Sequence, residues 1–269
     1  MNVTTSEKNN VFDSLDKIIR TVERYKKEPN FSEEVNRMIN KKVDLHMSDN
    51  TLLNIIAELI AYSQGAKSER VEKMLKKGLL DRAFKNFGAT KVSHMSLDEV
   101  IAHHWNDIKV IRFKKKVTAI IDCAKALSIL KERHGSFCDA LEQSGIPVRI
   151  KNNDDIGRFW TGFNEFKRII IETGIPFLRN TTTLLHFLLD LGYDCCKPDL
   201  VVMKVAKDIG IVASANKDRD LCATVRKLQE YSLAKGIRSS VVDFYLLVYG
   251  GQTWAVQFVT KWPLPVKMA

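Results

Sequence analysis

The sequence predicts an all-α protein, and the scarcity of turn-forming residues is the first sign of this class. The 269 residues include only 13 glycines and 6 prolines, which is about 7% of the chain against roughly 12% in average usage. A β-sandwich or barrel needs a turn after each short strand, so this composition argues against both. Hydrophobic residues make up 45% of the chain, enough to fill one large core or two small ones.

Helical periodicity is the second sign. From Phe113 to Leu130, apolar residues recur at steps of three and four with lysines between them, which is typical of an amphipathic helix with a basic outer face. Similar patterns predict further helices at about 11–27, 32–42, 51–63, 67–86, 96–104, 136–144, 153–173, 180–191, 198–209, 217–235 and 238–249. No internal repeat is evident, which favours a compact helical protein over a solenoid.

Residues suited to helix ends are the third sign. Ser48 or Asp49 can cap the helix at 51–63, and Ser96 can cap the helix that begins there. Glycines follow several helix ends, where a left-handed residue is favoured: Gly145, Gly174, Gly210, Gly236 and Gly250. The only candidate strand covers about residues 254–259, where apolar and polar residues partly alternate.

The sequence predicts no membrane contact and no disulfides. Its longest apolar stretches, such as 55–62 and 241–248, fall far short of the roughly 18 residues that would span a bilayer. The polar N-terminus lacks the apolar region of a secretory signal, and two of the five cysteines are adjacent, at 195 and 196. We therefore expect a cytoplasmic protein with reduced, buried or half-buried thiols.

The net charge of +10 is unevenly distributed. Residues 1–50 carry nine basic and nine acidic side chains, so the whole excess lies from Thr51 onward, concentrated at 106–135 and 197–238. Such a distribution fits binding to nucleic acid, and it fits a merely soluble basic surface equally well.

Two segments in the first half of the chain carry residues suited to binding. Residues 60–68 run from an apolar helix into Ser63 and Gln64, which place uncharged donors and acceptors between two helices. Residues 106–116 place several cations at a helix start. These cations can meet phosphates, with salt-dependent affinity, or form an ordinary solvated helix face.

Two segments in the second half suggest an anion site and a catalytic group. Residues 172–183 form a tight turn between two helices, where Arg179 and the backbone N–H groups near Asn180 offer a phosphate a cation and a helix dipole. Asn180 also suits an ordinary N-cap. In Lys197-Pro198-Asp199, Asp199 is either a capping residue or an anion that faces a developing positive charge.

Taken in this order, the four segments resemble the helix-hairpin-helix superfamily of DNA glycosylases, and most of all relatives of 3-methyladenine DNA glycosylase I. The resemblance covers about residues 50–250. The family's Ser/Gln loop is similar to Tyr62-Ser63-Gln64, and its Ile-Arg-Asn-x-x-Lys run to residues 110–124, with its Gly-Ser-Phe at 135–137. Its Gly-x-Thr-Thr hairpin is similar to residues 179–182, and its Lys-Pro-Asp aspartate to Asp199.

The resemblance implies a two-lobed helical fold with three parts. Residues 1–50 would form an N-terminal helical extension, and residues 51–250 a helix-hairpin-helix glycosylase-like domain with its hairpin at about 165–190. Residues 251–269 would form a C-terminal tail.

The resemblance also implies a DNA glycosylase of base excision repair. Such an enzyme flips a damaged, here alkylated, base out of double-stranded DNA and hydrolyses its N-glycosidic bond. Asp199 would stabilise the oxocarbenium-like transition state and orient the water, while Gln64 would fill the space that the base vacates. We expect a monomer that is associated with the nucleoid when bound to DNA.

The resemblance assigns further residues to the base and to the DNA backbone. For the pocket walls, which need aromatic faces, the candidates are Tyr62, Trp160 and Phe163, with Trp105 behind them, although each also suits a helical core. The expected backbone contacts are Arg112, Lys114, Lys115, Lys116, Gly174, Arg179, Asn180, Thr181, Thr182 and Lys197.

Departures from the family pattern limit the expected chemistry. Pro176 and Arg179 stand in the turn in place of the usual glycines, and no His-x-x-x-Cys pair follows Gly192. The structural zinc of 3-methyladenine DNA glycosylase I is therefore not expected, and the only ion considered is a monovalent cation at the hairpin. No lysine lies between Gly174 and Thr183, which argues for a monofunctional enzyme without Schiff-base chemistry.

Two other interpretations stay open. A helical module could have kept the fold and bind DNA or a protein without catalysis, which the altered hairpin favours and the Lys-Pro-Asp motif opposes. A glycosylase acting on RNA or on a modified phage base is a third, weaker interpretation that nothing in the sequence excludes.

Overall fold

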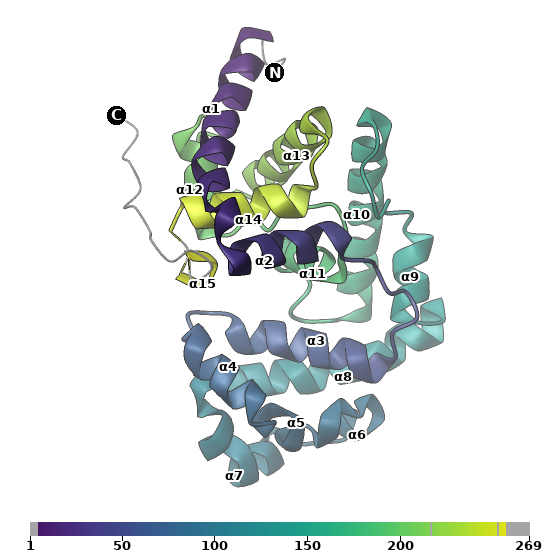
Figure 1. Cartoon of the computed structure of the whole chain (residues 1–269). Helices are drawn as coiled ribbons and strands as arrows, with labels where there is room; N and C mark the ends of the chain where they lie inside the picture. The colour runs from purple at the N-terminus through teal and green to yellow at the C-terminus, as the bar shows by residue number, and fades with distance from the viewer. Residues whose placement is uncertain (1–4, 216, 252, 257–269) are drawn as a thin grey trace. The chain divides into compact units, whose positions relative to one another are not determined.

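The computed structural model describes residues 5–215, 217–251 and 253–256, and every regular element in these ranges is a helix (Figure 1). The α-helices of the first half are α1 (Thr5–Glu23), α2 (Pro29–Asn40), α3 (Asp49–Tyr62), α4 (Ser68–Lys76), α5 (Leu79–Ala83), α6 (Ala89–Ser93), α7 (Leu97–Ile108), α8 (Lys114–His134) and α9 (Phe137–Gln143). Those of the second half are α10 (Asn153–Thr173), α11 (Thr181–Leu191), α12 (Leu200–Asp208), α13 (Asp218–Lys235), α14 (Ser239–Tyr249) and α15 (Thr253–Val256). Short 3-10 helices cover Arg24–Lys27 (η1), Lys85–Phe87 (η2) and Lys109–Ile111 (η3). The predicted all-α class is confirmed.

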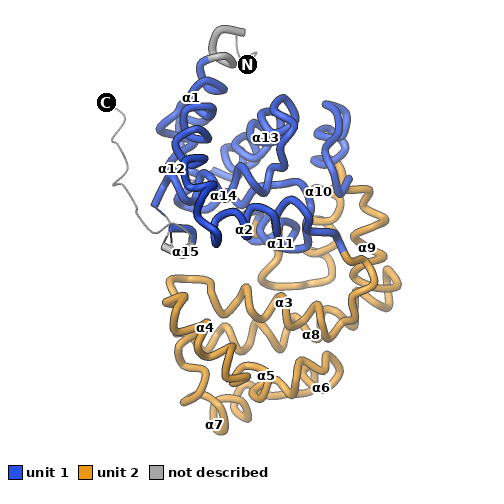
Figure 2. The backbone as a smooth tube through the Cα atoms, viewed as in Figure 1, with its two compact units in different colours: residues 1–43, 147–160, 181–269 blue, residues 44–146, 161–180 orange. Residues whose placement is uncertain are grey.

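The chain divides into two compact units (Figure 2). Unit 1 comprises Met1–Val43, Pro147–Trp160 and Thr181–Ala269, and unit 2 comprises Asp44–Ile146 and Thr161–Asn180. Residues from the start of the chain thus share a unit with the C-terminal helices, whereas the sequence predicts an N-terminal extension that ends at residue 50.

Unit 1 is built around α14, whose residues are almost all buried. A helix that is apolar on every side needs neighbours on every side, and α1, α2, α12 and α13 all pack against it. The ring centroid of Phe31, in α2, lies 5.2 Å from that of Phe244 and 5.7 Å from that of Tyr245. The N-terminal helices are therefore part of the core that carries the C-terminal half.

Unit 2 is built around α8, the helix that the longest apolar pattern predicts. It packs against α3, α6, α7 and α9 and buries Val117, Ile120, Ile121 and Leu127 among others. The rings of Phe137 and Phe166 meet edge to face, with centroids 5.2 Å apart. The outer face of α8 keeps its charged residues in water, as the amphipathic pattern indicates.

Several predicted helix ends are confirmed. The Ser48 hydroxyl accepts a hydrogen bond from the Thr51 backbone N–H at 3.2 Å, and the Ser96 hydroxyl accepts one from the Glu99 N–H at 3.1 Å. All five cysteines are free thiols, and Cys195 and Cys196 are fully buried. In the described part of the chain no helix is both long and apolar enough to cross a membrane.

Two predictions about elements are wrong. The single helix expected at 67–86 is interrupted by the left-handed Gly78 and continues as α5 and η2. The expected strand at 254–259 is helical as far as Val256, in α15, and its residues 257–259 lie outside the described residues. A four-residue helix cannot be told from a strand by an apolar pattern alone.

Candidate functional site

The Gln64 loop and the basic run at 109–116 form one surface in unit 2. The guanidinium of Arg112 donates hydrogen bonds to the carbonyl oxygens of Gly65, at 2.8 Å, and Gln64, at 3.3 Å. Arg112 directly follows η3, and the loop directly follows α3. Two segments about 50 residues apart in the sequence therefore meet here. The structure thus brings together two of the motifs that the sequence analysis treats separately.

Exposed aromatic and polar side chains project from this surface. Gln64 is exposed, and the exposed fractions of Tyr62 and Phe113 are both 37%, a high value for aromatic residues. The Arg112 guanidinium and the Lys115 ammonium lie 5.1 Å and 5.3 Å from the centre of the Phe113 ring. Nucleic-acid bases stack on aromatic faces, and phosphates are attracted to cations such as these.

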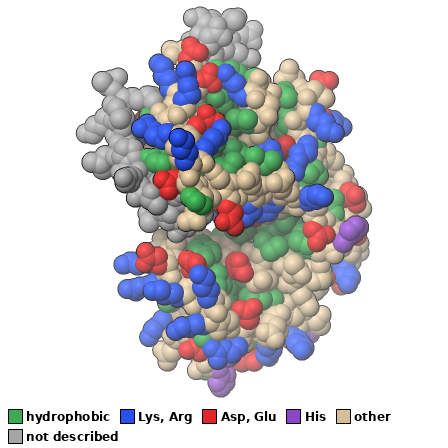
Figure 3. All heavy atoms as spheres, in the orientation of Figure 1, with side chains coloured by type: hydrophobic (Ala, Val, Ile, Leu, Met, Phe, Trp, Pro, Cys, Tyr) green, Lys and Arg blue, Asp and Glu red, His purple; other side chains and the backbone are tan. Residues whose placement is uncertain are grey.

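Lysines next to this loop add positive charge to the same unit. Lys114 and Lys115 are exposed, and the Lys114 ammonium lies 5.9 Å from the ring centre of the half-buried Trp105. Lysine and arginine side chains also gather over the α4 end of unit 2, with acidic ones among them (Figure 3). The surface is therefore basic but not uniformly so.

Lys116 does not lie on this surface, contrary to the expected backbone contact. Only 3% of the residue is exposed, and its ammonium donates to the carbonyl oxygens of Ser63, at 2.6 Å, and Ala61, at 3.1 Å. Burial, helped by the charges of Arg112 and Lys115, lowers the pKa of Lys116 to about 8. A cation in this position caps the C-terminal end of α3 and cannot reach a phosphate.

The predicted hairpin begins in unit 2, at the end of α10. Gly174 has a φ of +83° there, and the Ile175 N–H donates to the Ile170 carbonyl at 3.2 Å, which closes the helix end. Arg179 and Asn180 are exposed. The Arg179 guanidinium folds back and donates to the Gly174 carbonyl at 2.9 Å, so part of its donor capacity is used within the turn.

The start of α11 lies beside the Lys-Pro-Asp turn in unit 1. Thr181 is buried, and its hydroxyl donates to the Asp218 carboxylate at 2.7 Å, so this residue is not on the surface as a backbone contact would be. The half-buried Thr182 has its hydroxyl 3.5 Å from the Pro198 carbonyl oxygen. The third and fourth motifs are therefore neighbours.

Asp199 caps α12 with one carboxylate oxygen. Oδ1 accepts hydrogen bonds from the backbone N–H groups of Val201, at 2.9 Å, and Val202, at 3.0 Å. The second oxygen, Oδ2, lies 3.9 Å from the Lys197 ammonium, and 17% of the side chain is exposed. The capping interpretation is confirmed, and the cap uses only Oδ1.

Asp243 supports the Lys-Pro-Asp turn, and the sequence analysis missed it. This fully buried carboxyl accepts a hydrogen bond from the Lys197 N–H at 2.7 Å. Burial, together with the nearby Asp199, raises the pKa of Asp243 well above its usual value. The signal was present in the sequence, since Asp243 is the only charged residue in the apolar run 241–248.

A small cavity of about 80 Å³ lies next to this turn in unit 1 and carries mixed charge. Its lining includes Arg37, Lys41, His186, Asp190, Lys197 and Asp243. Burial and the charges of Lys197 and Lys41 lower the pKa of His186 to about 3, so this histidine is neutral although Asp190 lies 3.4 Å away. In the described residues no group of three or more His, Cys, Asp or Glu side chains could hold a metal ion.

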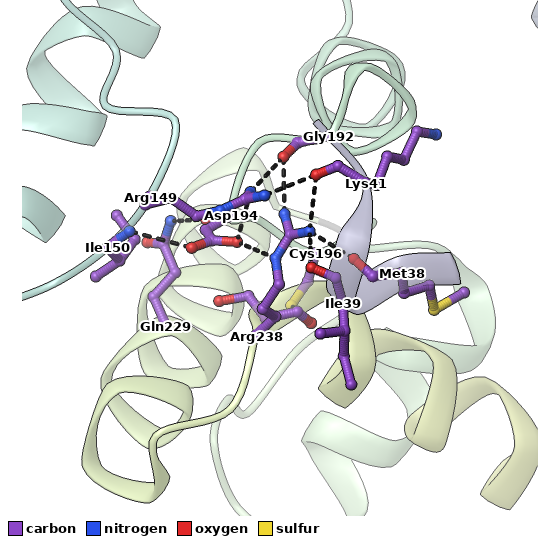
Figure 4. Close-up of polar contacts among 11 residues, drawn as sticks. Met38, Ile39, Lys41, Arg149, Ile150, Gly192, Asp194, Cys196, Gln229 and Arg238 are labelled. Carbon is purple, nitrogen blue, oxygen red and sulfur yellow. Dashed lines mark hydrogen bonds and ion pairs between the residues drawn. The ribbon is translucent and has the colours of Figure 1, made fainter. Parts of the chain in front are cut away.

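Arg238, which lines this cavity, forms a polar cluster with Arg149 and Asp194 (Figure 4). Arg238 donates to Asp194 Oδ1 at 2.8 Å and to the Gly192 carbonyl at 2.7 Å, and Arg149 donates to the Gly192 carbonyl at 2.8 Å. Both arginines also donate to the Lys41 carbonyl, at 3.2 Å and 2.6 Å. The C-terminal end of α2 is thereby joined to the segment before Asp199.

Trp160 and Phe163 are buried, with 5% and 1% of their surface exposed, and so are not placed as open pocket walls. The Trp160 indole donates to Gln229 Oε1 at 3.0 Å, and Gln229 donates in turn to the Asp194 carbonyl at 2.9 Å. A buried indole with a satisfied N–H is typical of a core residue. Leu200, by contrast, is 85% exposed directly after Asp199 and was not among the expected residues.

One family model matches the chain, and its segment includes the surface just described. Residues 60–156 match the model of the methyladenine glycosylases; this segment holds the Gln64 loop and the basic run and ends before the hairpin and Asp199. No curated protein and no solved structure matches the chain. The match supports a DNA glycosylase role in general terms. Over residues 60–156 the chain is therefore similar to the methyladenine glycosylases, which confirms its resemblance to the helix-hairpin-helix DNA glycosylase superfamily.

Proposed function

We propose that this protein is a monofunctional DNA glycosylase that flips an alkylated base out of a duplex and hydrolyses its N-glycosidic bond. The observation that carries the proposal is the family match over residues 60–156, because it covers the loop and basic surface that would meet DNA. The carboxylate of Asp199 supports it from the other half of the chain. Its Oδ1 is held by two backbone N–H groups, and its Oδ2 lies 3.9 Å from the Lys197 ammonium.

Asp199 would act on the sugar. An alkylated base such as 3-methyladenine carries a positive charge, so the C–N bond breaks with its electron pair going to the base, which leaves neutral. The charge that develops on the sugar is stabilised by the Asp199 carboxylate. A water molecule then adds to the sugar carbon and gives its proton to the same carboxylate or to solvent, as in glycoside hydrolysis. No general acid is needed for such a leaving group.

Residues of unit 2 would hold and open the duplex. Lys114 and Lys115 present charge to phosphates, and each neutralised phosphate releases counterions. Gln64 would enter the stack where the base has left, at an unstacking cost of a few kcal/mol that is lowest for a lesion. The absence of lysine between Gly174 and Thr183 supports hydrolysis without strand cleavage.

Asp199→Asn tests the proposal sharply because asparagine is as good an N-cap as aspartate. We expect the variant to keep its thermal midpoint and its salt-sensitive binding to DNA, and to lose base release. The assay is mass-spectrometric identification of bases released from duplexes that carry alkylated, oxidised or deaminated bases. Asp208→Asn, an exposed carboxylate on the same helix that pairs with Lys204 at 2.8 Å, is the matched control and should behave as wild type.

The same assay tests whether a divalent metal is needed and which class of base is released. Base release that persists in EDTA supports catalysis without a resident divalent metal, and the class of base released identifies the lesion. If the wild-type protein releases nothing from this panel, the enzymatic proposal is overturned. Unchanged base release by Asp199→Asn would show that another residue is the catalytic group.

A non-catalytic DNA-binding module is the second candidate, and the hairpin favours it. The Arg179 guanidinium is engaged with the Gly174 carbonyl in its own turn, and Thr181 is buried, so two of the expected backbone contacts are used structurally. Duplex binding with the expected salt dependence, but without base release from any lesion, is the result that this candidate predicts.

A further inference from the structure

The loop that carries Gln64 is joined to the basic run through its backbone carbonyls. Four of them, from Ala61, Ser63, Gln64 and Gly65, accept hydrogen bonds from only two side chains, Lys116 and Arg112. The last carbonyls of a helix have no partner within the helix and lie at the negative end of its dipole. The two cations therefore neutralise the C-terminal end of α3, and their hydrogen bonds extend to the carbonyls of the loop that follows it.

The backbone of this loop needs such support. Gln64 has a φ of +52° and Gly65 a φ of +72°, and the left-handed region is unfavourable for a residue with a side chain such as glutamine. Arg112 itself has a φ of +79°, so both sides of the contact hold backbone conformations that are rarely adopted. Strain of this kind persists where surrounding contacts fix it, and it is often found at functional sites.

The fit between the two segments is close. A Cβ atom built on Gly65 would lie 2.7 Å from Arg112 Nη1, so only glycine lets the guanidinium reach both loop carbonyls. Lys116 reaches the loop from the inside of unit 2. A lysine normally extends its ammonium to water, and here it gives up that hydration for two carbonyl oxygens.

While the backbone is fixed, the side chains at the tip are free to meet DNA. Gln64 is exposed, and Tyr62 and Phe113 each expose more than a third of their surface. A rigid backbone that presents an exposed amide lowers the entropy cost of inserting into a base stack.

We propose that Arg112 and Lys116 are positioning residues that hold the Gln64 loop as a preformed wedge for the space left by a flipped base. The inference rests on the proposed function for the identity of the DNA substrate, but it concerns the opening of the duplex and not bond cleavage. It also gives Arg112 and Lys116 a role different from phosphate binding. Their donors are turned toward the protein's own loop.

The test compares binding to an intact duplex with binding to the same duplex carrying a stable abasic-site analogue. A preformed wedge fills the gap in the abasic duplex, so wild type should bind it more tightly. In Arg112→Gln and Lys116→Met this preference should fall about tenfold, roughly the effect of losing one hydrogen bond to a charged group. Affinity for the intact duplex should change much less.

Gly65→Ala separates positioning from phosphate binding because it removes no charge. Its Cβ displaces the Arg112 guanidinium from the loop, so it should reproduce the loss of preference seen in Arg112→Gln. In a Gln64→Ala background the Arg112 substitution should have no further effect, since the two residues act through one element. Lys125→Met, an exposed lysine of α8 that pairs with Asp122, is the control and should keep the full preference.

The results distinguish this inference from the proposed function. Wild type that releases no base but prefers the abasic duplex, with the preference lost in the variants, refutes the enzyme and supports the wedge. Equal weakening of both duplexes in Arg112→Gln shows a phosphate contact and overturns the inference, as does an unchanged preference in Gly65→Ala. Should Lys116→Met fail to fold, the two surface variants still decide the question.

Discussion

The guanidinium of Arg238 donates to Oδ1 of Asp194 at 2.8 Å, and both side chains are largely buried. The second carboxylate oxygen accepts from the Ile150 N–H at 3.1 Å, so every strong contact of this carboxylate is internal. Around it, Arg149 and Arg238 tie the Lys41 carbonyl to the segment before Asp199 (Figure 4). The pair thus links the N-terminal helices to the chain that positions the candidate catalytic group.

Asp194→Ala should therefore destabilise the protein strongly. Removing one partner leaves the largely buried guanidinium of Arg238 and the half-buried one of Arg149 without their carboxylate, which costs about 3–5 kcal/mol in the free energy of unfolding. Urea denaturation followed by circular dichroism measures this change. Asp208→Ala removes an exposed carboxylate that pairs with Lys204 and should cost about 0–1 kcal/mol. Similar values for the two variants would show that the cluster contributes no more than a surface ion pair.

Trp160→Phe should reduce stability without changing base release. The substitution removes the indole N–H and leaves the buried Gln229 oxygen without the donor that now lies 3.0 Å away, at a cost of about 1–3 kcal/mol. Thermal unfolding measures the loss, and single-turnover base release at a temperature below the transition measures the chemistry. A variant with normal stability and slow base release would show that Trp160 acts in the base pocket and not in the core.

The helices could be predicted from the sequence because their signals are local. The capping serines Ser48 and Ser96 and the period of three to four in α8 depend only on neighbours in the chain. Lys116 could have been predicted too. It stands four residues before Ile120 and eleven before Leu127, on the apolar stripe of α8, whereas Lys114 and Lys115 lie off that stripe.

Other features depend on contacts that no local pattern encodes. The hydrogen bonds from Arg112 to Gln64 and Gly65 join residues almost 50 positions apart, and the burial of Trp160 depends on Gln229 in α13. Gly250 shows the difference clearly. The sequence predicts a left-handed residue there, but its φ is −74°, and the glycine is needed because α12 packs closely against it.

Gly250→Ala should therefore destabilise unit 1. The added Cβ would overlap Cγ1 of Val201, and overpacking of this kind costs about 1–3 kcal/mol. Gly157→Ala is the matched control, because its Cβ on α10 would meet nothing within 4 Å and alanine is favoured in a helix by about 0.5–1 kcal/mol. The two substitutions should shift the unfolding midpoint in opposite directions, and a stabilising effect of both would show that α12 can move away at no cost.

Lys115→Gln should reduce the salt dependence of DNA binding. An exposed lysine that neutralises one phosphate contributes about 0.9 to the slope of log K against log salt, so the variant should bind all duplexes more weakly and with a slope smaller by about one unit. Fluorescence anisotropy at several salt concentrations measures both quantities. Lys125→Gln, on the same helix, should leave the slope as it is, and an unchanged slope in Lys115→Gln would remove this lysine from the interface.

His186 should make the protein sensitive to acid. Its pKa is about 6.5 in an unfolded chain and about 3 in the folded protein, where burial and the charges of Lys197 and Lys41 oppose protonation. Between pH 6.5 and 3 the unfolded chain therefore binds the extra proton, so the stability that this group contributes at neutral pH is lost as the pH falls through that window. His186→Gln cannot be protonated and should show a shallower loss of unfolding free energy from pH 6.5 downward. His103→Gln, at an exposed position on α7, should keep the wild-type pH profile. Identical profiles for His186→Gln and wild type would mean that the half-buried imidazole takes up its proton without cost.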